Sequence, residues 1–159
     1  MAVVMAGIAR SVKQHGQPVR GPALLLSGGE TTVTVRQGQA GKGGRNTEFL
    51  LSLACALQGQ EDIWAIAGDS DGIDGTEDAA GAMVFPDTLT RGKLSGLNAL
   101  NALDNHTSYS YFHALDDLLI PGPTVTNVHD IRALLLACAC PRHPCRGRAG
   151  LSLHAAPRP

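Results

Sequence analysis

A glycine-rich segment that ends in a basic and polar run is the first part of this chain whose residue types suggest chemistry. Its sequence is GKGGRNTE at residues 41–48, and a stretch with helical periodicity follows it. Glycines let the backbone approach a ligand closely, and the N-terminus of a helix offers free N–H groups and a positive dipole end. Arg45 adds a planar donor that suits a carboxylate or a phosphate. The segment predicts an anion site, with a flexible loop and a solvated arginine as the alternative; its spacing is not that of a Walker phosphate loop.

An acidic loop, DSDGIDGTED at residues 69–78, is the second candidate. An EF-hand interpretation fails, because counting from Asp69 places Asp74 where that calcium loop needs glycine and Ala80 where it needs glutamate. Two chemical roles remain, namely holding Mg²⁺ near a nucleotide and accepting hydrogen bonds from substrate hydroxyls. The structural alternative is that the aspartates close tight turns through their side chains, with glycines at positive φ.

Two further polar residues follow apolar or rigid segments. Glu30 comes after the turn Gly28-Gly29, and Asn127 follows a Pro-Gly-Pro turn. We expect both to lie near the same site, although Glu30 has the plain alternative of capping a neighbouring loop. The histidines at 106, 113 and 129 show no metal-ligand spacing, so surface or partly buried positions are expected for them.

Alternating strand and helix patterns must position these segments. We expect helices over 2–15, 47–57, 88–94 and 109–118, and strands over 23–26, 31–36, 63–67 and 82–84, with a last apolar segment ending near 136. This alternation favours a layered α/β domain with a mixed, mainly parallel sheet. Because ligands gather where strands of such sheets end, the polar loops should converge at one edge.

The composition is that of a globular domain. Of the 159 residues, 43% are apolar and 17% are charged. No apolar run is long enough to cross a bilayer, and the apolar start has no basic residue before it, so we expect a cytoplasmic protein without a secretory signal. Residues 1–136 carry 9 Lys and Arg against 14 Asp and Glu, a balance of −5 that is a poor match for nucleic acid.

Residues 137–159 differ from the rest of the chain. They hold four arginines, no acidic residue and three of the four cysteines. The spacing of Cys138, Cys140 and Cys145 beside His143 matches no common zinc framework. We therefore expect a domain at 1–136 and a disordered tail at 137–159, with the thiols reduced.

Three long segments, in order, resemble the MOFRL domain, the C-terminal domain of the class II glycerate 2-kinases, which are often labelled hydroxypyruvate reductases. The segments are 24–48, 69–81 (DSDGIDGTEDAAG) and 121–131 (PGPTVTNVHDI), and the resemblance extends over about residues 2–136. It implies ATP-dependent phosphorylation of D-glycerate to 2-phosphoglycerate with Mg²⁺. The site would lie in a cleft between this domain and an N-terminal Rossmann-like domain.

The resemblance also implies roles for single residues. Arg45 falls on the family motif GGRN, Asp71 on the acidic loop, and His129 stands where the family motif TNVND has asparagine. We take Arg45 and Asp71 as the catalytic candidates. The substrate-binding candidates are Glu30, Gly43, Gly44, Asn46, Asp74 and Asn127. No metal ligand is assigned.

The family's N-terminal domain has no counterpart in these 159 residues, so we expect D-glycerate and the nucleotide to need a second domain and the chain alone to have little activity. NAD(P)H-dependent hydroxypyruvate reduction is one alternative. It requires a Gly-x-Gly-x-x-Gly turn after a strand, which the sequence does not contain. A non-catalytic remnant that binds small anions, or that pairs with a separately encoded half, is the other.

Overall fold

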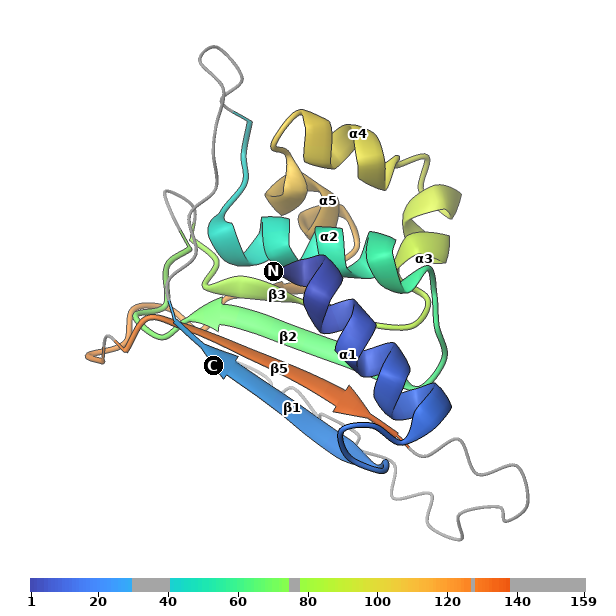
Figure 1. Ribbon diagram of the computed structural model, residues 1–159. Helices are drawn as coiled ribbons and strands as arrows, with labels where there is room; N and C mark the ends of the chain where they lie inside the picture. Colours follow the sequence, from blue (N-terminus) through green and yellow to red (C-terminus); the bar gives the residue numbers. More distant parts are fainter. Residues whose placement is uncertain (30–40, 75–77, 127, 138–159) are drawn as a thin grey trace, which may run out of the picture.

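The computed structural model describes residues 1–29, 41–74, 78–126 and 128–137. Within these ranges a five-stranded sheet forms one layer and the helices pack on one of its faces (Figure 1). The elements in chain order are α1 (Ala2–His15), β1 (Ala23–Gly28), α2 (Arg45–Leu57), β2 (Ile63–Asp69), β3 (Gly81–Val84), α3 (Thr88–Leu94), α4 (Ala99–Asp104), α5 (Ser108–Ala114), β4 (Leu118–Leu119) and β5 (Asp130–Leu136). The α/β class expected from the sequence is confirmed.

The expectation of a mainly parallel sheet is wrong. The strand order is β1-β5-β2-β3-β4, and every neighbouring pair is antiparallel. β1 and β2 do run in the same direction, with α2 as the crossover between them, but β5 lies between them and pairs with both. The order of elements along the chain, strand then helix then strand, suggested that β1 and β2 pair directly as parallel neighbours. The sequence does not show that the last strand, β5, lies between them.

The predicted convergence of the polar loops is confirmed, first for the acidic loop and the loop before β5. The strand register places the ends of β1, β2 and β4 and the beginnings of β3 and β5 at one edge of the sheet. There the Thr124 N–H donates to the Asp71 carbonyl (2.9 Å), and the Val128 N–H donates to the Ser70 hydroxyl (2.7 Å). Gly72 has φ +95°, and a Cβ on it would lie 2.2 Å from the carbonyl oxygen of Gly122, so only glycine allows these two loops to meet.

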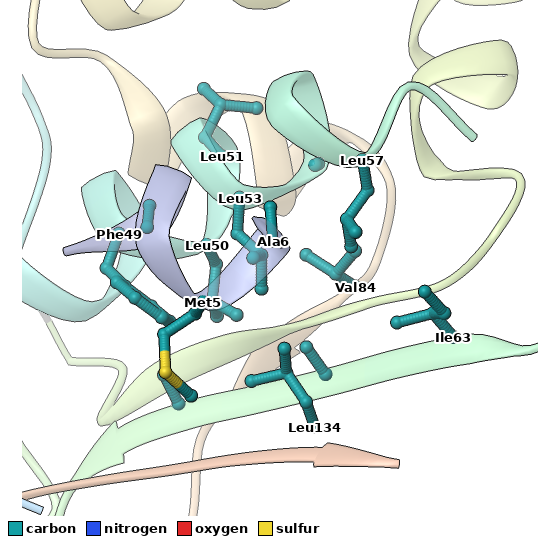
Figure 2. Close-up of a cluster of buried hydrophobic side chains, with 14 of the residues drawn as sticks. Met5, Ala6, Phe49, Leu50, Leu51, Leu53, Leu57, Ile63, Val84 and Leu134 are labelled. Carbon is teal, nitrogen blue, oxygen red and sulfur yellow. The ribbon is translucent and has the colours of Figure 1, made fainter. Parts of the chain in front are cut away.

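The hydrophobic core fills the space between the sheet and the two longest helices, α1 and α2. In Figure 2, Met5 of α1 and Phe49 and Leu50 of α2 lie above the sheet residues Ile63 and Leu134. The buried residues of α1 recur every three or four positions, as a helix with one apolar face requires. Each large aliphatic side chain buried in this way stabilises the fold by about 1.5–3 kcal/mol.

Most expected elements are present, and the differences are local. α2 begins at Arg45, two residues earlier than expected, and α5 ends at Ala114 rather than near 118. α4 was not expected; the side chain of Asn98 caps it by accepting a hydrogen bond from the Asn101 N–H (3.0 Å). The predicted strand at 31–36 and the tail at 138–159 lie outside the described residues. No helix in the described part of the chain is long and apolar enough to cross a membrane.

Candidate active site

A carboxylate of the chain itself occupies the N-terminus of α2. Asp74 Oδ2 accepts hydrogen bonds from the backbone N–H groups of Asn46 (2.9 Å) and Thr47 (3.2 Å). First-turn N–H groups have no partner within a helix, and the helix dipole favours a negative charge beside them. The sequence led us to expect free N–H groups here for a bound anion. That expectation is wrong for these two donors, because a residue from the distant acidic loop caps the helix.

The glycines before α2 are required by contacts within the protein. A Cβ on Gly44 would lie 2.2 Å from Asp74 Oδ2, and a Cβ on Gly43 would lie 2.8 Å from the carbonyl oxygen of His106. Both distances are too short for a real Cβ contact. The close backbone approach that the sequence suggested is thus made to the chain's own atoms. Substrate contacts by Gly43 and Gly44 stay predictions.

Arg45, the first residue of α2, lies between two carboxylates. They stand at the end of the sheet where β1, β2 and β4 end and the polar loops begin, which we call the loop edge. Its Nη2 donates to Asp69 Oδ2 at 2.8 Å and lies 3.6 Å from Asp130 Oδ1. The two aspartate side chains are 6% and 0% exposed, whereas that of Arg45 is 29% exposed. These carboxylates fix the direction of the guanidinium, which stays partly exposed.

Below Arg45 the charged network continues into the core. Asn46 Nδ2 donates to Asp130 Oδ1 at 2.9 Å, and Arg132 Nη2 donates to Asp130 Oδ2 at 2.7 Å. Asn46, Asp130 and Arg132 are all fully buried, and the Arg132 guanidinium also lies 5.1 Å from the centre of the Phe49 ring. A buried network whose members are paired is rigid, because breaking any contact leaves an uncompensated charge in a medium of low polarity.

A second group of hydrogen bonds joins the start of α2 to the start of α5. Thr47 Oγ1 lies 2.9 Å from the Ser108 hydroxyl, and Ser108 donates to Glu48 Oε1 at 3.1 Å. His106 Nδ1 is 3.7 Å from the same Glu48 oxygen. Burial raises the pKa of Glu48, and the Ser108 hydrogen bond and His106 oppose that rise. These contacts hold the first turn of α2 against the start of α5 and the turn before it.

Asp74 is the carboxyl group whose protonation matters most here. Burial raises its pKa from 3.8 to about 6; the N–H groups of Thr47 and Asn46 and the nearby Arg45 lower it, and the neighbouring Asp130 raises it. The side chain is only 2% exposed. The negative charge that caps α2 is therefore held at an energetic cost, and its protonation falls in a range that mild acidification reaches.

Asp71 has the role that the structural alternative described. Its Oδ1 accepts a hydrogen bond from the Ile73 N–H (2.9 Å), and its own N–H donates to Asp69 Oδ1 (3.2 Å), so both aspartates close turns of the acidic loop. Contact of Asp71 with a substrate hydroxyl stays a prediction. Glu30 and Asn127, two of the substrate-binding candidates, lie outside the described residues.

The described residues do not form a Mg²⁺ site by themselves. Nowhere in the described ranges are three or more His, Cys, Asp or Glu side chains grouped as metal ligands. Asp69 and Asp130 are paired with Arg45, and Asp74 caps a helix. Asp71 offers one carboxylate. Mg²⁺ needs six oxygen ligands in a near-octahedral arrangement, so most of them would have to come from phosphates, water or residues outside this group.

Sequence reasoning did not assign a role to Asp130 and Arg132. The signal that identifies them is their spacing in DIRALLL, where two charged residues at i and i+2 share one face of an otherwise apolar strand. On the buried face of a sheet, two such charges must pair with each other or with neighbours. Asp69 was seen only as one member of the acidic loop, and its pairing with Arg45 depends on the tertiary fold.

Comparisons with known proteins agree with one another. A family model described as the MOFRL family matches residues 23–130. A protein of Agrobacterium vitis with the provisional name hydroxypyruvate reductase is 59% identical over 136 residues, which are 86% of this chain and 35% of that protein. A D-glycerate 2-kinase of Thermotoga maritima is 42% identical over 127 residues, 80% of this chain and 30% of the kinase. The crystal structure of glycerate kinase from that organism matches with a TM-score of 0.81 at 40% identity, over 86% of this chain and 32% of the other. The chain thus spans about a third of the length of these relatives.

Proposed function

The chain belongs to the MOFRL family, and we propose that it forms the C-terminal active-site domain of an ATP-dependent D-glycerate 2-kinase. The reaction converts D-glycerate to 2-phosphoglycerate. The observation that carries the proposal is the position of Arg45, a partly exposed arginine that Asp69 holds at the loop edge. The chain that presents it is 42% identical to a D-glycerate 2-kinase over the matched residues. We propose that a second, Rossmann-like domain supplies the opposite wall of the cleft, so that this chain alone has little activity.

Arg45 would act by position and charge. Phosphoryl transfer gives a protein little covalent chemistry to do, so catalysis depends on placing the reactants and stabilising developing negative charge. Both the glycerate carboxylate and the transferring phosphoryl group are anions that a guanidinium binds with two parallel N–H donors. The hydrogen bond to Asp69 fixes the guanidinium before a ligand arrives, which lowers the entropic cost of binding.

Other residues of the edge would orient the substrate. Asp71 would accept a hydrogen bond from a substrate hydroxyl, and its turn belongs to the acidic loop that also supplies Asp69, the partner of Arg45. ATP supplies the phosphoryl group and Mg²⁺ neutralises its charge when both are bound. Since Asp74 fills the N-terminus of α2, the phosphates would be bound by side chains and by the second domain rather than by that helix.

A chimeric kinase tests the proposal. Residues 2–136 would replace the matching third of the T. maritima D-glycerate 2-kinase, and ATP-dependent formation of 2-phosphoglycerate would be measured. We expect turnover by the chimera and a loss of about 10²–10³-fold in kcat with Arg45→Lys, the usual effect of removing one preorganised donor. Arg91→Lys is the matched control, because Arg91 is 32% exposed and is paired with Asp117 (2.6 Å) away from this edge.

Three results would contradict this proposal. An active chimera that Arg45→Lys leaves unchanged would remove Arg45 from the site. A folded but inactive chimera would favour a non-catalytic remnant. Robust turnover of D-glycerate by the chain alone would show that no second domain is needed.

Hydroxypyruvate reduction is the second candidate, because the A. vitis relative at 59% identity carries that name. It requires a nicotinamide dinucleotide, whose pyrophosphate typically binds at the N-terminus of a helix after a parallel strand. In this chain Asp74 caps the helix after β1, and the described sheet is antiparallel. We therefore expect no hydroxypyruvate-dependent oxidation of NADH or NADPH by the chimera above background, and oxidation well above it would favour the reductase.

A further inference from the structure

Two aspartates of neighbouring strands lie directly opposite each other at the loop edge. The register of β2 and β5 pairs Asp69 with Asp130, and both side chains are buried. Like charges in such a pair repel each other and destabilise a sheet. The two aspartates therefore need positive charge beside them. Arg45 supplies the first, because its Nη2 lies 2.8 Å from Asp69 Oδ2 and 3.6 Å from Asp130 Oδ1.

A second arginine, Arg132, supplies the other positive charge. It follows Asp130 by two residues on the same face of β5, and its Nη2 donates to Asp130 Oδ2 at 2.7 Å. Its guanidinium also donates to the carbonyl oxygen of Gly29 (3.3 Å) and lies over the Phe49 ring of α2. The Arg132 side chain is fully buried, so a substrate at the loop edge does not reach it.

Stability alone does not explain a buried ion pair at this place. Taking two charges out of water can cost more than their attraction returns, and apolar side chains of similar volume are often as good or better. The buried face of β5 continues with Leu134 and Leu136, so apolar residues at 130 and 132 would extend an apolar stripe. The charged pair is better explained by its effect on the neighbouring Arg45.

The charge balance indicates what that effect is. Asp69, Arg45 and Asp130 carry two negative charges and one positive charge, a net charge of −1 that opposes the approach of an anion. Arg132 brings the sum of the four groups to zero. Asp74 is a fifth charged group nearby, and two N–H groups at the start of α2 accept its charge separately.

We propose that Asp130 and Arg132 form a positioning pair for Arg45. Asp130, together with Asp69, aims the guanidinium, and Arg132 cancels the charge of Asp130 so that an anionic reactant is not repelled. Asp130 Oδ1 also accepts from Asn46 Nδ2 (2.9 Å), so the pair holds the first two residues of α2 together. Neither member touches the substrate. The pair rests on the proposed function, in which Arg45 binds the glycerate carboxylate or the transferring phosphoryl group.

The two members of the pair should affect binding and turnover differently in the chimeric kinase. Arg132→Met leaves the charge of Asp130 uncompensated, so the dissociation constant of the anion that Arg45 binds should rise about tenfold. Asp130→Asn keeps the acceptor for Asn46 but aims Arg45 less firmly, so kcat should fall about tenfold while the anion binds at least as tightly. In the double variant the charges balance again, so the affinity should return to that of the wild type while kcat stays low.

Isothermal titration calorimetry with D-glycerate alone and with ATP and Mg²⁺ alone measures the affinities, and formation of 2-phosphoglycerate gives kcat. The reporting anion is the one whose affinity Arg45→Lys changes. Arg132→Lys keeps the charge and should keep the affinity. Arg91→Met is the matched control, because it takes the arginine from the buried Asp117 away from the loop edge and should change neither value.

Circular dichroism would confirm that each variant is folded. If Arg132→Met does not fold, the step from Asp130→Asn to the double variant removes the same positive charge and should raise the dissociation constant by the same factor. A merely structural pair would weaken binding and lower kcat together, in proportion to the loss of stability, and that result would overturn the proposal. Unchanged affinity on removal of the Arg132 charge would overturn it as well.

The Arg45→Lys chimera separates this proposal from the proposed function. If Arg45→Lys changes neither the affinities nor kcat, Arg45 is not part of the site and both proposals fail. If Arg45→Lys lowers kcat as expected while the variants of Asp130 and Arg132 behave like Arg91→Met, only the positioning role of the pair is lost.

Discussion

The carboxylate that caps α2 makes a prediction about how stability depends on pH. Asp74 has an ordinary pKa of 3.8, and burial raises it to about 6 in the folded chain. The folded state therefore binds this proton more tightly than the unfolded state does. The resulting stabilisation is fully present below pH 3.8 and is lost as the pH rises through about 6. A change of pKa of this size corresponds to about 3 kcal/mol.

Replacing Asp74 with asparagine isolates the effect. Asparagine keeps an oxygen that can accept the N–H groups of Asn46 and Thr47, but it does not ionise in this range. We expect the free energy of unfolding of the wild type, minus that of Asp74→Asn, to fall by about 2.4 kcal/mol between about pH 4 and pH 7. Other titrating groups, such as the half-buried Glu48, contribute to both proteins and largely cancel in the difference.

Urea unfolding followed by Trp64 fluorescence, at one low protein concentration across this pH range, measures the difference. Asp71→Asn is the control, because it removes a carboxylate from the same loop without touching the helix cap. A difference for Asp74→Asn that stays constant with pH would refute the argument that burial dominates. A difference that rises with pH would show that the N–H groups at the start of α2 and Arg45 stabilise the charge by more than burial costs.

Three further predictions concern the buried network and the backbone. Arg132→Met should lower the free energy of unfolding by about 3–5 kcal/mol, because it leaves the buried Asp130 without its nearer ion-pair partner. Adding Asp130→Asn should recover part of the loss, and urea unfolding of the two single variants and the double variant checks this. Gly44→Ala should lower the free energy of unfolding by about 1–3 kcal/mol, because the new Cβ would overlap the Asp74 carboxylate that caps α2. Gly7→Ala on α1 should raise it by about 0.5–1 kcal/mol, because nothing lies within 4 Å of the new Cβ. Equal shifts of the melting temperature for the two variants would contradict the packing argument. His129 has φ +64°, a conformation that asparagine tolerates and a β-branched residue does not. His129→Val should therefore lower the free energy of unfolding by about 1–2 kcal/mol, whereas His129→Asn should change it by no more than about 0.5 kcal/mol. Differential scanning calorimetry of the two variants measures the difference.

Local patterns determined much of this protein from its sequence. The apolar periodicity of residues 2–15 gave α1, and the helix after GKGGRN was placed within two residues. Three ordered motifs identified the family, and they directed attention to Arg45 and to the acidic loop. These features depend on neighbours along the chain, so their physical causes are visible in the sequence. His129 stands where the resembled motif has asparagine, and its positive φ is a conformation that asparagine tolerates.

Only the tertiary structure decided which strands are neighbours and which groups meet. The insertion of β5 between β1 and β2 made the sheet antiparallel and placed Asp130 beside Asp69, where both contact Arg45. The same long-range arrangement placed Asp74 on the N-terminus of α2, so the anion that this helix binds is part of the chain itself. Contacts between residues far apart in sequence depend on how strands and loops pack together, and no local spacing specifies that packing. The sequence therefore supplied Arg45, Asn46 and Asp74 as candidates, and the fold determined which charged groups neutralise one another.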